Sequence, residues 1–248
     1  MHCSGGVVLL LEAAGLTVRY DGIEALRNVS FHVEQGEMVA LIGPNGAGKS
    51  TALKAVSGTL DQAGGRICQG TISLHGELIT HLRTDQLVRR GVCLVPEGRR
   101  VFTSLTVMEN LEMGAYTLTT KGSARPRIEE VLELFPLLRD RTKHRAGSLS
   151  AGEQQMLALA RALILHPKLL MADEPSVGLS PRVADAVFEK LVELNRGGAS
   201  ILFVEQNVRR ALSVCQRAYL MVSGVVAAEG SSEALSNSQP VREAFLGG

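Results

Sequence analysis

The nine residues 43–51, with the sequence GPNGAGKST, constrain the fold of this chain more than any other segment. They follow an apolar run at 38–42 and lead into a stretch, 49–56, with helical character. The spacing G-x-x-x-x-G-K-S is that of a phosphate-binding loop, whose backbone N–H groups converge on phosphate oxygens. An ordinary glycine-rich turn is the alternative, but the position after a strand and before a helix favours the phosphate loop.

The loop gives each of its polar groups an expected role. Lys49 is expected to reach the β- and γ-phosphates of a nucleotide, and Ser50 is expected to bind Mg²⁺ through its hydroxyl. The helix that begins here adds the positive end of its dipole. The expected nucleotide-binding residues are Gly43, Asn45, Gly46, Ala47, Gly48, Lys49, Ser50 and Thr51.

Composition narrows the class of protein. A chain of 248 residues with 45% hydrophobic residues can bury a core as one large domain, or as one domain with a lobe. The net charge of +1, the absence of tryptophan and the aromatic content of 4% give no reason to expect nucleic acid as a partner. The four cysteines (Cys3, Cys68, Cys93 and Cys215) lack metal-ligand spacing, so we expect reduced thiols in a cytosolic protein. The apolar run at 7–11 is too short for a signal peptide or a membrane span.

Strand and helix patterns alternate along the chain. Strands are expected at 16–20, 28–34, 38–42, 71–75, 91–96, 168–173, 200–205 and 217–222. The segment 99–166 has a mainly helical pattern, interrupted by a polar stretch at 117–126 that is a candidate surface insertion. We therefore predict an α/β fold with a largely parallel sheet, β-rich ends and a helical lobe.

Two adjacent carboxylates, Asp173 and Glu174, follow the apolar run at 169–172. In an open α/β sheet, ligands bind at the carboxyl ends of the strands, the same edge that carries the phosphate loop. Asp173 is then placed to hold Mg²⁺ through water, and Glu174 to polarise the water that attacks the γ-phosphate. A loop or a helix N-cap would explain such a pair in isolation.

A third motif, LSAGEQQ at 149–155, precedes a periodic apolar helix. Ser150 is a sound N-cap, so a capped helix is the simple interpretation. However, Tyr20, the phosphate loop, this motif and the two carboxylates occur in the order and approximate spacing of an ATP-binding cassette. Over nearly its whole length the chain resembles the nucleotide-binding domain of ABC transporters. The resemblance implies one P-loop NTPase domain over 1–248, with a parallel-sheet core, an antiparallel β subdomain and a helical subdomain inserted at about 99–166.

The resemblance also implies a head-to-tail dimer that encloses ATP and Mg²⁺. The phosphate loop of one subunit would face Ser150, Gly152 and Glu153 of the other, and hydrolysis would release the dimer. Tyr20 matches the aromatic residue that stacks on adenine, with a strand-core tyrosine as the alternative. The segment 176–181 matches the loop that communicates across the dimer, and its last two residues also suit helix initiation.

Three positions depart from the common cassette pattern. Glu97 stands where most members carry glutamine, and as a carboxylate it would bind Mg²⁺ together with Ser50 and Asp173. Gln206 stands where most carry histidine, so it can donate a hydrogen bond to the γ-phosphate but cannot carry a proton. Ala151 replaces a glycine of the signature. A slower or asymmetric ATPase is one consequence. The expected catalytic residues are Glu174, Lys49 and Gln206.

The phrases PEGRRVF at 96–102, TVMENL at 106–111 and VEQN at 204–207 resemble the LivF-type ATP-binding subunit of branched-chain amino acid importers, with a urea-type importer subunit as a similar alternative. This implies two membrane permease subunits, a second ATPase subunit, and an extracytoplasmic solute-binding protein as an indirect partner. It places the chain in the cytoplasm, peripheral on the inner face of the cell membrane. The region 99–111 would receive the permease, although Arg99 and Arg100 can also be a solvated pair.

Two other classes of function remain open. A soluble cassette protein that works in translation or on DNA is disfavoured by the single cassette and the near-neutral charge. A regulatory subunit with little catalysis is compatible with Glu97 and Gln206, but the intact Lys49, Asp173 and Glu174 argue against it. The transported solute cannot be read from this chain, because selectivity belongs to the permease and the binding protein. The tail from about 231 shows two short helical stretches.

Overall fold

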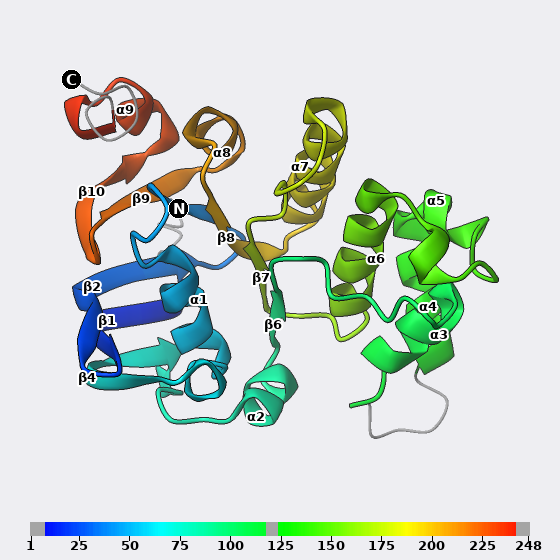
Figure 1. The fold of residues 1–248 in the computed structure, drawn as a ribbon, viewed down its shortest axis with the longest axis horizontal. Helices are drawn as coiled ribbons and strands as arrows, with labels where there is room; N and C mark the ends of the chain where they lie inside the picture. Colours follow the sequence, from blue (N-terminus) through cyan, green and yellow to red (C-terminus); the bar gives the residue numbers. More distant parts are fainter. Residues whose placement is uncertain (1–7, 118–123, 242–248) are drawn as a thin grey trace, which may run out of the picture.

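A six-stranded sheet forms the centre of the computed structural model, which describes residues 8–117 and 124–241. The strand order is β10-β9-β3-β8-β7-β6 (Figure 1). Neighbouring strands from β9 to β6 run parallel, and β10 is antiparallel to β9. The strands are β3 (Met38–Ile42), β6 (Val92–Val95), β7 (Leu169–Asp173), β8 (Ser200–Glu205), β9 (Arg217–Val222) and β10 (Val225–Ser231).

Three of the four inner strands, β3, β7 and β8, are buried along their whole length. Side chains on a strand alternate between the two faces of the sheet, so a strand covered on both faces is apolar along its middle, with polar residues only at its ends. In β3, Ala40 and Ile42 belong to a core cluster that also contains residues from the helices after position 100. Val39 and Leu41 point to the other face and belong to a second core cluster, shared with a second sheet. This double coverage explains why these strands read as continuous apolar runs.

The second sheet is antiparallel, with the order β2-β1-β4-β5. Helix α1 (Lys49–Ser57) contributes Leu53 and Val56 to the same core cluster as Phe31 of β2 and Leu41 of β3. The start of this helix, where the phosphate loop ends, is thereby anchored to both sheets. The strands are β1 (Leu9–Tyr20), β2 (Ile23–Glu34), β4 (Gly65–Leu74) and β5 (Glu77–Leu78).

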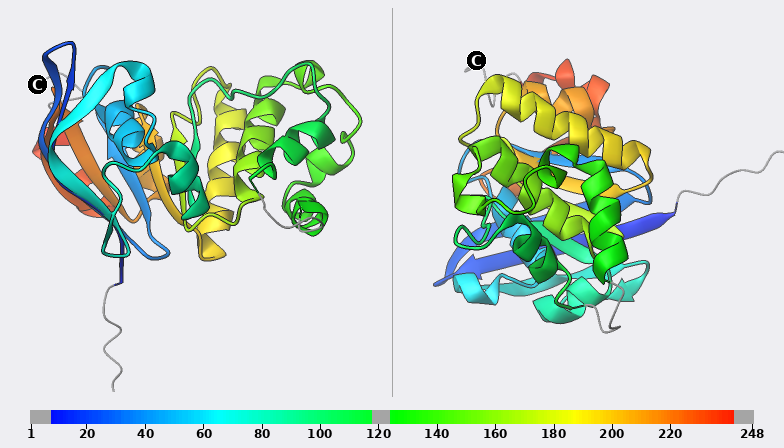
Figure 2. Two further views of the ribbon diagram at one scale, coloured as in Figure 1. Left: turned by 90° about the horizontal axis from the view of Figure 1, so that it is seen from below. Right: turned by 90° about the vertical axis from the view of Figure 1, so that its right-hand side faces the viewer.

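A helical lobe stands beside the sheets, with α7 between it and the central strands (Figures 1 and 2). Helix α6 packs against α3, α5 and α7, so it joins the lobe to the α/β core. The lobe consists of α3 (Val107–Gly114), α4 (Ala124–Leu134), α5 (Pro136–Arg139) and α6 (Ala151–Leu163). The other helices are α2 (Thr84–Arg89), α7 (Pro181–Arg196), α8 (Val208–Val214) and α9 (Ser232–Ser236), with 3-10 turns at Asp61–Ala63 and Ala146–Ser148.

Asn110 fixes the loop that enters the lobe. Its side chain is fully buried, accepts a hydrogen bond from the backbone N–H of Phe102 at 2.8 Å, and donates to the carbonyl oxygens of Phe102 and Thr106 at 3.0 and 2.9 Å. A buried amide that satisfies several backbone groups holds a loop as firmly as secondary structure would. The asparagine of the TVMENL phrase therefore determines the path of residues 102–106.

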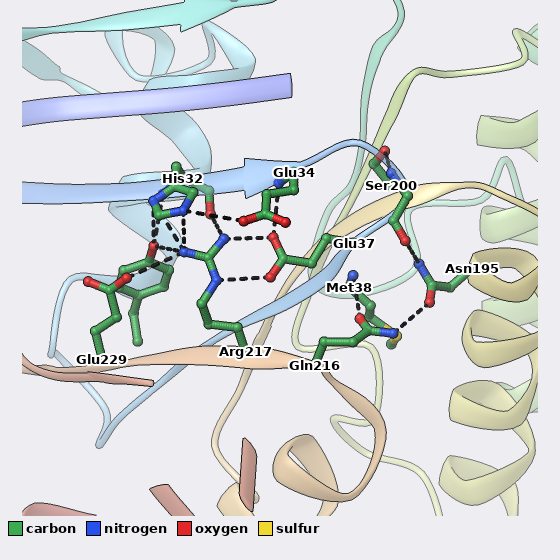
Figure 3. Close-up of polar contacts among 11 residues, drawn as sticks. His32, Glu34, Glu37, Met38, Asn195, Ser200, Gln216, Arg217 and Glu229 are labelled. Carbon is green, nitrogen blue, oxygen red and sulfur yellow. Dashed lines mark hydrogen bonds and ion pairs between the residues drawn. The ribbon is translucent and has the colours of Figure 1, made fainter. Parts of the chain in front are cut away.

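A polar clamp joins the two sheets at the edge where β3 and β9 begin (Figure 3). Arg217 donates to both carboxylate oxygens of Glu37, at 2.9 and 2.6 Å, and to the carbonyl oxygen of His32 of β2 at 3.2 Å. Burial lowers the pKa of Arg217, but the hydrogen bond to Glu37 and the charges of Tyr219, Glu37 and Glu34 together outweigh it, and the pKa is raised overall. This pair is bidentate and largely buried, so it holds β2 of the antiparallel sheet against β9. The clamp lies at the start of these strands, whereas the phosphate loop follows the end of β3.

The expected strands are all present, but several are longer than expected. The first two strands begin well before 16 and 28, and the apolar run at 7–11 includes the start of β1. The terminal strand β10 was missed because its side chains alternate between exposed and half-buried positions and include Gly230, which leaves no strong apolar signal.

The mainly helical pattern at 99–166 is confirmed: the described residues 99–117 and 124–166 form α3, α4, α5 and α6 with their loops. Of the expected insertion at 117–126, residues 118–123 lie outside the described residues, and Ala124 already begins α4. The first helical stretch of the tail is α9, and residues 239–241 are helical again; residues 242–248 lie outside the described part. Within the ranges 8–117 and 124–241, no helix is long and apolar enough to cross a membrane. The single domain over 1–248 stays a prediction.

Candidate functional site

The phosphate loop connects β3 to α1, and its glycines are needed for two different reasons. A Cβ atom on Gly43 would lie 2.1 Å from the carbonyl oxygen of Met221, and one on Gly48 would lie 2.6 Å from Leu26. Gly46 has open space around it, but its φ of +79° is a conformation that other residues rarely adopt. Close packing therefore requires glycine at positions 43 and 48, and the positive φ of the backbone favours glycine at position 46.

Lys49 begins α1 and is almost fully buried, with 4% of its surface exposed. Its ammonium group donates to the carbonyl oxygens of Gly43 and Pro44 at 2.9 and 3.0 Å. Burial lowers the pKa of this lysine, while the carboxylates at the ends of β7 and β8 act in the opposite direction. Phosphate oxygens are stronger, charged acceptors than loop carbonyls, so the ammonium is well placed to exchange these contacts for a nucleotide.

Ser50 and Asp173 meet where α1 begins and β7 ends. The serine hydroxyl donates to the carboxylate of Asp173 at 2.9 Å, and Asp173 is 6% exposed. Burial raises the pKa of Asp173, the hydrogen bond from Ser50 opposes that shift, and the negative charges of Glu174 and Glu97 add to it. A neighbouring cation would therefore strongly stabilise the ionised form of this buried carboxylate.

The oxygen groups of Ser50, Asp173 and Glu97 fit Mg²⁺, which is bound through one or two carboxylates together with substrate phosphates. Within the described ranges, no group of three or more His, Cys, Asp or Glu side chains could hold a metal ion by itself. The donor set is thus of the kind that a nucleotide phosphate completes.

Glu174 follows β7 and is 9% exposed. Its backbone has a φ of +46°, an uncommon value for a residue with a side chain, and its N–H donates to the carbonyl oxygen of Val204 in β8 at 3.1 Å. The side-chain amide of Gln206 donates a hydrogen bond to its carboxylate. A left-handed conformation costs on the order of 1–2 kcal/mol, and such strain is typical of functional positions.

These side chains share one cleft of about 380 Å³. Asp173 borders the adjoining cavity together with Ser50 and Glu97. A larger cavity of about 710 Å³ lies elsewhere, between the end of α1, β4 and α2, but none of the predicted site residues lines it. The smaller cleft is therefore the candidate site. It is lined by Ala25, Asn45, Gly46, Ala47, Gly48, Lys49, Ser50, Thr51, Glu97, Glu174 and Gln206.

Tyr20 does not line this cleft. It ends β1, and its half-buried ring packs on the core cluster beside Gly65, where an added Cβ would lie 2.7 Å from the ring. These contacts match the strand-core alternative, and its adenine-stacking role stays a prediction.

The LSAGEQQ motif also lies apart from the cleft within this single chain. Ser150 caps α6: its hydroxyl accepts from the N–H of Glu153 at 3.4 Å, while the Glu153 carboxylate accepts from the N–H of Ser150 at 2.7 Å. A Cβ on Gly152 would lie 2.3 Å from Val183 of α7, which explains the need for glycine. The N-cap role of Ser150 is confirmed, and any nucleotide contact by Ser150, Gly152 or Glu153 would have to be made across an interface.

Sequence reasoning assigned no role to Glu205, the last residue of β8. It is 4% exposed, and its carboxylate accepts hydrogen bonds from Ser176 and from the backbone of Gln206 and Asn207. The available signal was an acid at the end of an apolar strand that is next to β7 in the sheet. Its partners could not be found from the sequence, because Ser176 is 29 positions away.

Comparisons with known proteins agree with this geometry. Residues 26–177 match the ABC transporter family. The chain is 45% identical to the "High-affinity branched-chain amino acid transport ATP-binding protein BraG" of Pseudomonas aeruginosa, over 96% of this chain and 100% of that protein. It is 38% identical to the "Probable branched-chain amino acid transport ATP-binding protein LivF" of Archaeoglobus fulgidus, over 96% and 99%. The crystal structure of an ATP-binding cassette in its ADP conformation matches with a TM-score of 0.85 and 26% identity, over 97% of this chain and 99% of that one. The chain therefore belongs to the ABC transporter family.

Proposed function

We propose that this chain is the ATP-binding and ATP-hydrolysing subunit of an importer for branched-chain amino acids. The observation that carries the catalytic part is the convergence of Lys49, Ser50, Glu174 and Gln206 on one cleft, with Asp173 hydrogen-bonded to Ser50. The functions named for the two relatives above support the solute class.

Each residue in the cleft has a separate task in this proposal. ATP is the substrate, and Lys49 and the loop N–H groups bind its phosphates. Ser50, Asp173 and Glu97 hold Mg²⁺, which neutralises negative charge on the phosphates when it is bound. Glu174 accepts the proton of the attacking water, and Gln206 keeps the Glu174 carboxylate in place. The left-handed backbone at Glu174 turns its carboxylate off the end of β7 toward this cleft.

We infer that a second ATPase subunit, identical or not, completes the site through Ser150, Gly152 and Glu153. Ser150 is exposed at the start of α6, where it forms a capping box with Glu153. The N–H groups of a helix N-terminus suit an anion such as the γ-phosphate. The absence of these residues from the cleft of a single chain is consistent with contact across a dimer.

The proposed docking region for two permease subunits is supported by an apolar groove beside residues 99–111. The groove measures about 260 Å³ and includes Phe102, Met113 and Arg161 in its lining. Phe102 and Met113 both line this groove and are each 44% exposed, so the groove presents apolar surface to a partner. Docking there would place the chain in the cytoplasm, on the inner face of the membrane. The solute-binding protein would be an indirect partner on the other side.

The ATP-trapped complex tests this proposal directly. A tagged Glu174→Gln form is incubated with ATP, extracted gently from native membranes and analysed by mass spectrometry. We expect two polytopic permease subunits and a second cassette subunit, and we expect to lose the second cassette with Lys49→Ala. Recovery of ribosomal or DNA-associated proteins, or of this chain alone, would contradict the transport function.

A further inference from the structure

Glu205 is a buried carboxylate with three hydrogen-bond donors around it. The hydroxyl of Ser176 donates to one of its oxygens at 2.7 Å. The backbone N–H groups of Gln206 and Asn207 donate to the other at 2.9 and 3.0 Å. With 4% of its surface exposed, Glu205 depends on these three donors for its solvation.

The energetics of this arrangement indicate a fixed contact. A buried carboxylate is destabilising unless its oxygens are hydrogen-bonded. Hydrogen bonds to an ionised group are also stronger than those between neutral groups. The three hydrogen-bond donors of Glu205 are neutral, and the Lys49 ammonium adds an electrostatic attraction. Loss of the Ser176 hydroxyl would leave one carboxylate oxygen without its hydrogen-bond donor. Glu205 thus holds both flanking segments in a single arrangement.

The two segments that Glu205 joins are those that carry the catalytic side chains. Ser176 lies two residues after Glu174, at the start of the loop that leads to α7. Gln206 begins the loop that leads to α8, and its side chain returns to the carboxylate of Glu174. A closed ring results, from Glu174 along the chain to Ser176, through Glu205 to Gln206, and back to Glu174.

We propose that Glu205 is a positioning residue for ATP hydrolysis, which keeps the Gln206 amide against Glu174 and makes that contact depend on Ser176. Val177, the next residue, is 41% exposed. The loop 176–181, to which both residues belong, is the one expected to face the second subunit. Displacement of this loop by the second subunit would pull on Ser176 and thereby change the position of Gln206. The inference rests on the proposed function, because it requires Glu174 to be the catalytic base.

The test compares Glu205→Gln and Ser176→Ala with the wild type in steady-state ATPase assays on the full-length chain. A glutamine has the same shape but no negative charge, and its amide nitrogen would face the Ser176 hydroxyl, so the charged acceptor of these hydrogen bonds is lost. We expect kcat to fall by about 10- to 100-fold, the range for a misplaced catalytic group, while KM and the affinity for ATP stay within about twofold. Ser176→Thr restores the hydroxyl and is expected to restore kcat. Because Glu205 links the two sites, the double variant Glu205→Gln with Ser176→Ala is expected to lose less than the product of the single losses.

Two further measurements separate this role from a purely structural one. Hydrogen exchange of the Gln206 and Asn207 amides is expected to accelerate in nucleotide-free Glu205→Gln. Asp185→Asn removes an exposed carboxylate that pairs with Arg210 at 3.1 Å across the same α7 and α8 helices, and it is expected to leave kcat unchanged.

Three outcomes would overturn the inference. The first is faster amide exchange with an unchanged kcat in Glu205→Gln, which would show a role in folding only. The second, which remains decisive if Glu205→Gln does not fold, is a normal kcat in Ser176→Ala. The third is that ATP hydrolysis by the wild type does not depend on Glu174, in which case the proposed function itself fails. Hydrolysis that Glu174→Gln abolishes but Ser176→Ala leaves intact would reject only the role of Glu205.

Discussion

Gln206 donates a hydrogen bond from its side-chain amide to the carboxylate of Glu174, across the ends of the neighbouring strands β8 and β7. The donor is neutral and cannot be protonated further, so it orients the carboxylate without neutralising it by an opposite charge. Glu174 itself has a left-handed backbone conformation, with a φ of +46°. The carboxylate of a residue with a strained backbone is therefore oriented by a neutral donor from the neighbouring strand end.

Glu174→Gln tests the assignment of the general base. Turnover should fall by roughly 100- to 10,000-fold, the range for a positioned base, because an amide cannot take a proton from water. ATP affinity should be kept, since the change leaves the phosphate loop intact. Steady-state hydrolysis and equilibrium binding of a fluorescent ATP analogue measure the two effects separately. Lys49→Ala is the contrasting variant and should weaken binding itself; near-normal turnover in Glu174→Gln would remove Glu174 from this role.

Gln206 offers a second test at the other end of the same hydrogen bond. Gln206→Ala should lower turnover by about 10- to 100-fold, because the Glu174 carboxylate loses its orienting donor. Gln206→His restores a donor, and it should retain turnover while adding a dependence on pH between about 6 and 8, where histidine titrates. Rate profiles against pH for the wild type and both variants provide the measurement. Identical turnover in all three proteins would make Gln206 peripheral.

The phosphate loop and the two carboxylates were predictable from the sequence for a physical reason. Lys49 and Ser50 act through their position in a short, continuous loop, and Asp173 and Glu174 follow a strand whose edge is set by the parallel topology. Such local patterns determine geometry without knowledge of distant contacts. The continuous apolar runs of β3, β7 and β8 indicated the central sheet in the same way.

Contacts between distant positions could not be predicted. The bond from Ser176 to Glu205 depends on how two loops meet, and either side chain alone reads as an ordinary polar residue. Similarly, the buried Asn110 appears in the sequence as one polar residue of an amphipathic helix, whereas the structure shows that it holds Phe102. The edge strand β10 lacks the apolar alternation that would reveal it.

Substitutions at two glycines distinguish the role of the phosphate loop in ATP binding from the cost of backbone strain. Gly46 and Gly22 have φ values of +79° and +86°, and an added Cβ would meet nothing within 4 Å at either position. Gly46→Ala and Gly22→Ala should therefore destabilise the fold similarly, by about 1–2 kcal/mol, which corresponds to a fall in melting temperature of about 2–8 °C. Gly46→Ala alone should weaken ATP binding, by about tenfold or more, because the loop N–H groups must converge on phosphate. Calorimetry of melting and of binding gives both values; equal ATP affinity in the two variants would contradict the loop assignment.

Asp173 should lower the stability of the nucleotide-free chain at neutral pH. Burial and the neighbouring Glu174 raise its folded-state pKa above the ordinary 3.8, so the folded chain binds this proton more tightly than the unfolded chain does. Stability from this group is therefore lost as the pH rises from 3.8 through the raised pKa. Asp173→Asn should raise the melting temperature at neutral pH, and this gain should vanish once the pH falls below 3.8.

Melting curves of the wild type and Asp173→Asn over a range of pH measure this difference. Asp185→Asn, at an exposed carboxylate, is the matched control and should show no such gain. The Asp173 variant should also lose the effect of Mg²⁺ on ATP affinity. A lower melting temperature than the wild type at neutral pH would show that the Asp173 carboxylate stabilises the empty site.

Uptake of radiolabelled solutes is the most direct test of whether this chain drives the import of branched-chain amino acids. Cells that lack the chromosomal copy are supplied with the wild-type chain or with Glu174→Gln, and the initial uptake of leucine, isoleucine, valine and urea is measured at low solute concentration. We expect Glu174→Gln to abolish the uptake of the three amino acids that the wild-type chain restores, and to leave urea uptake unchanged. Equal leucine uptake with both chains, or a loss confined to urea, would contradict it.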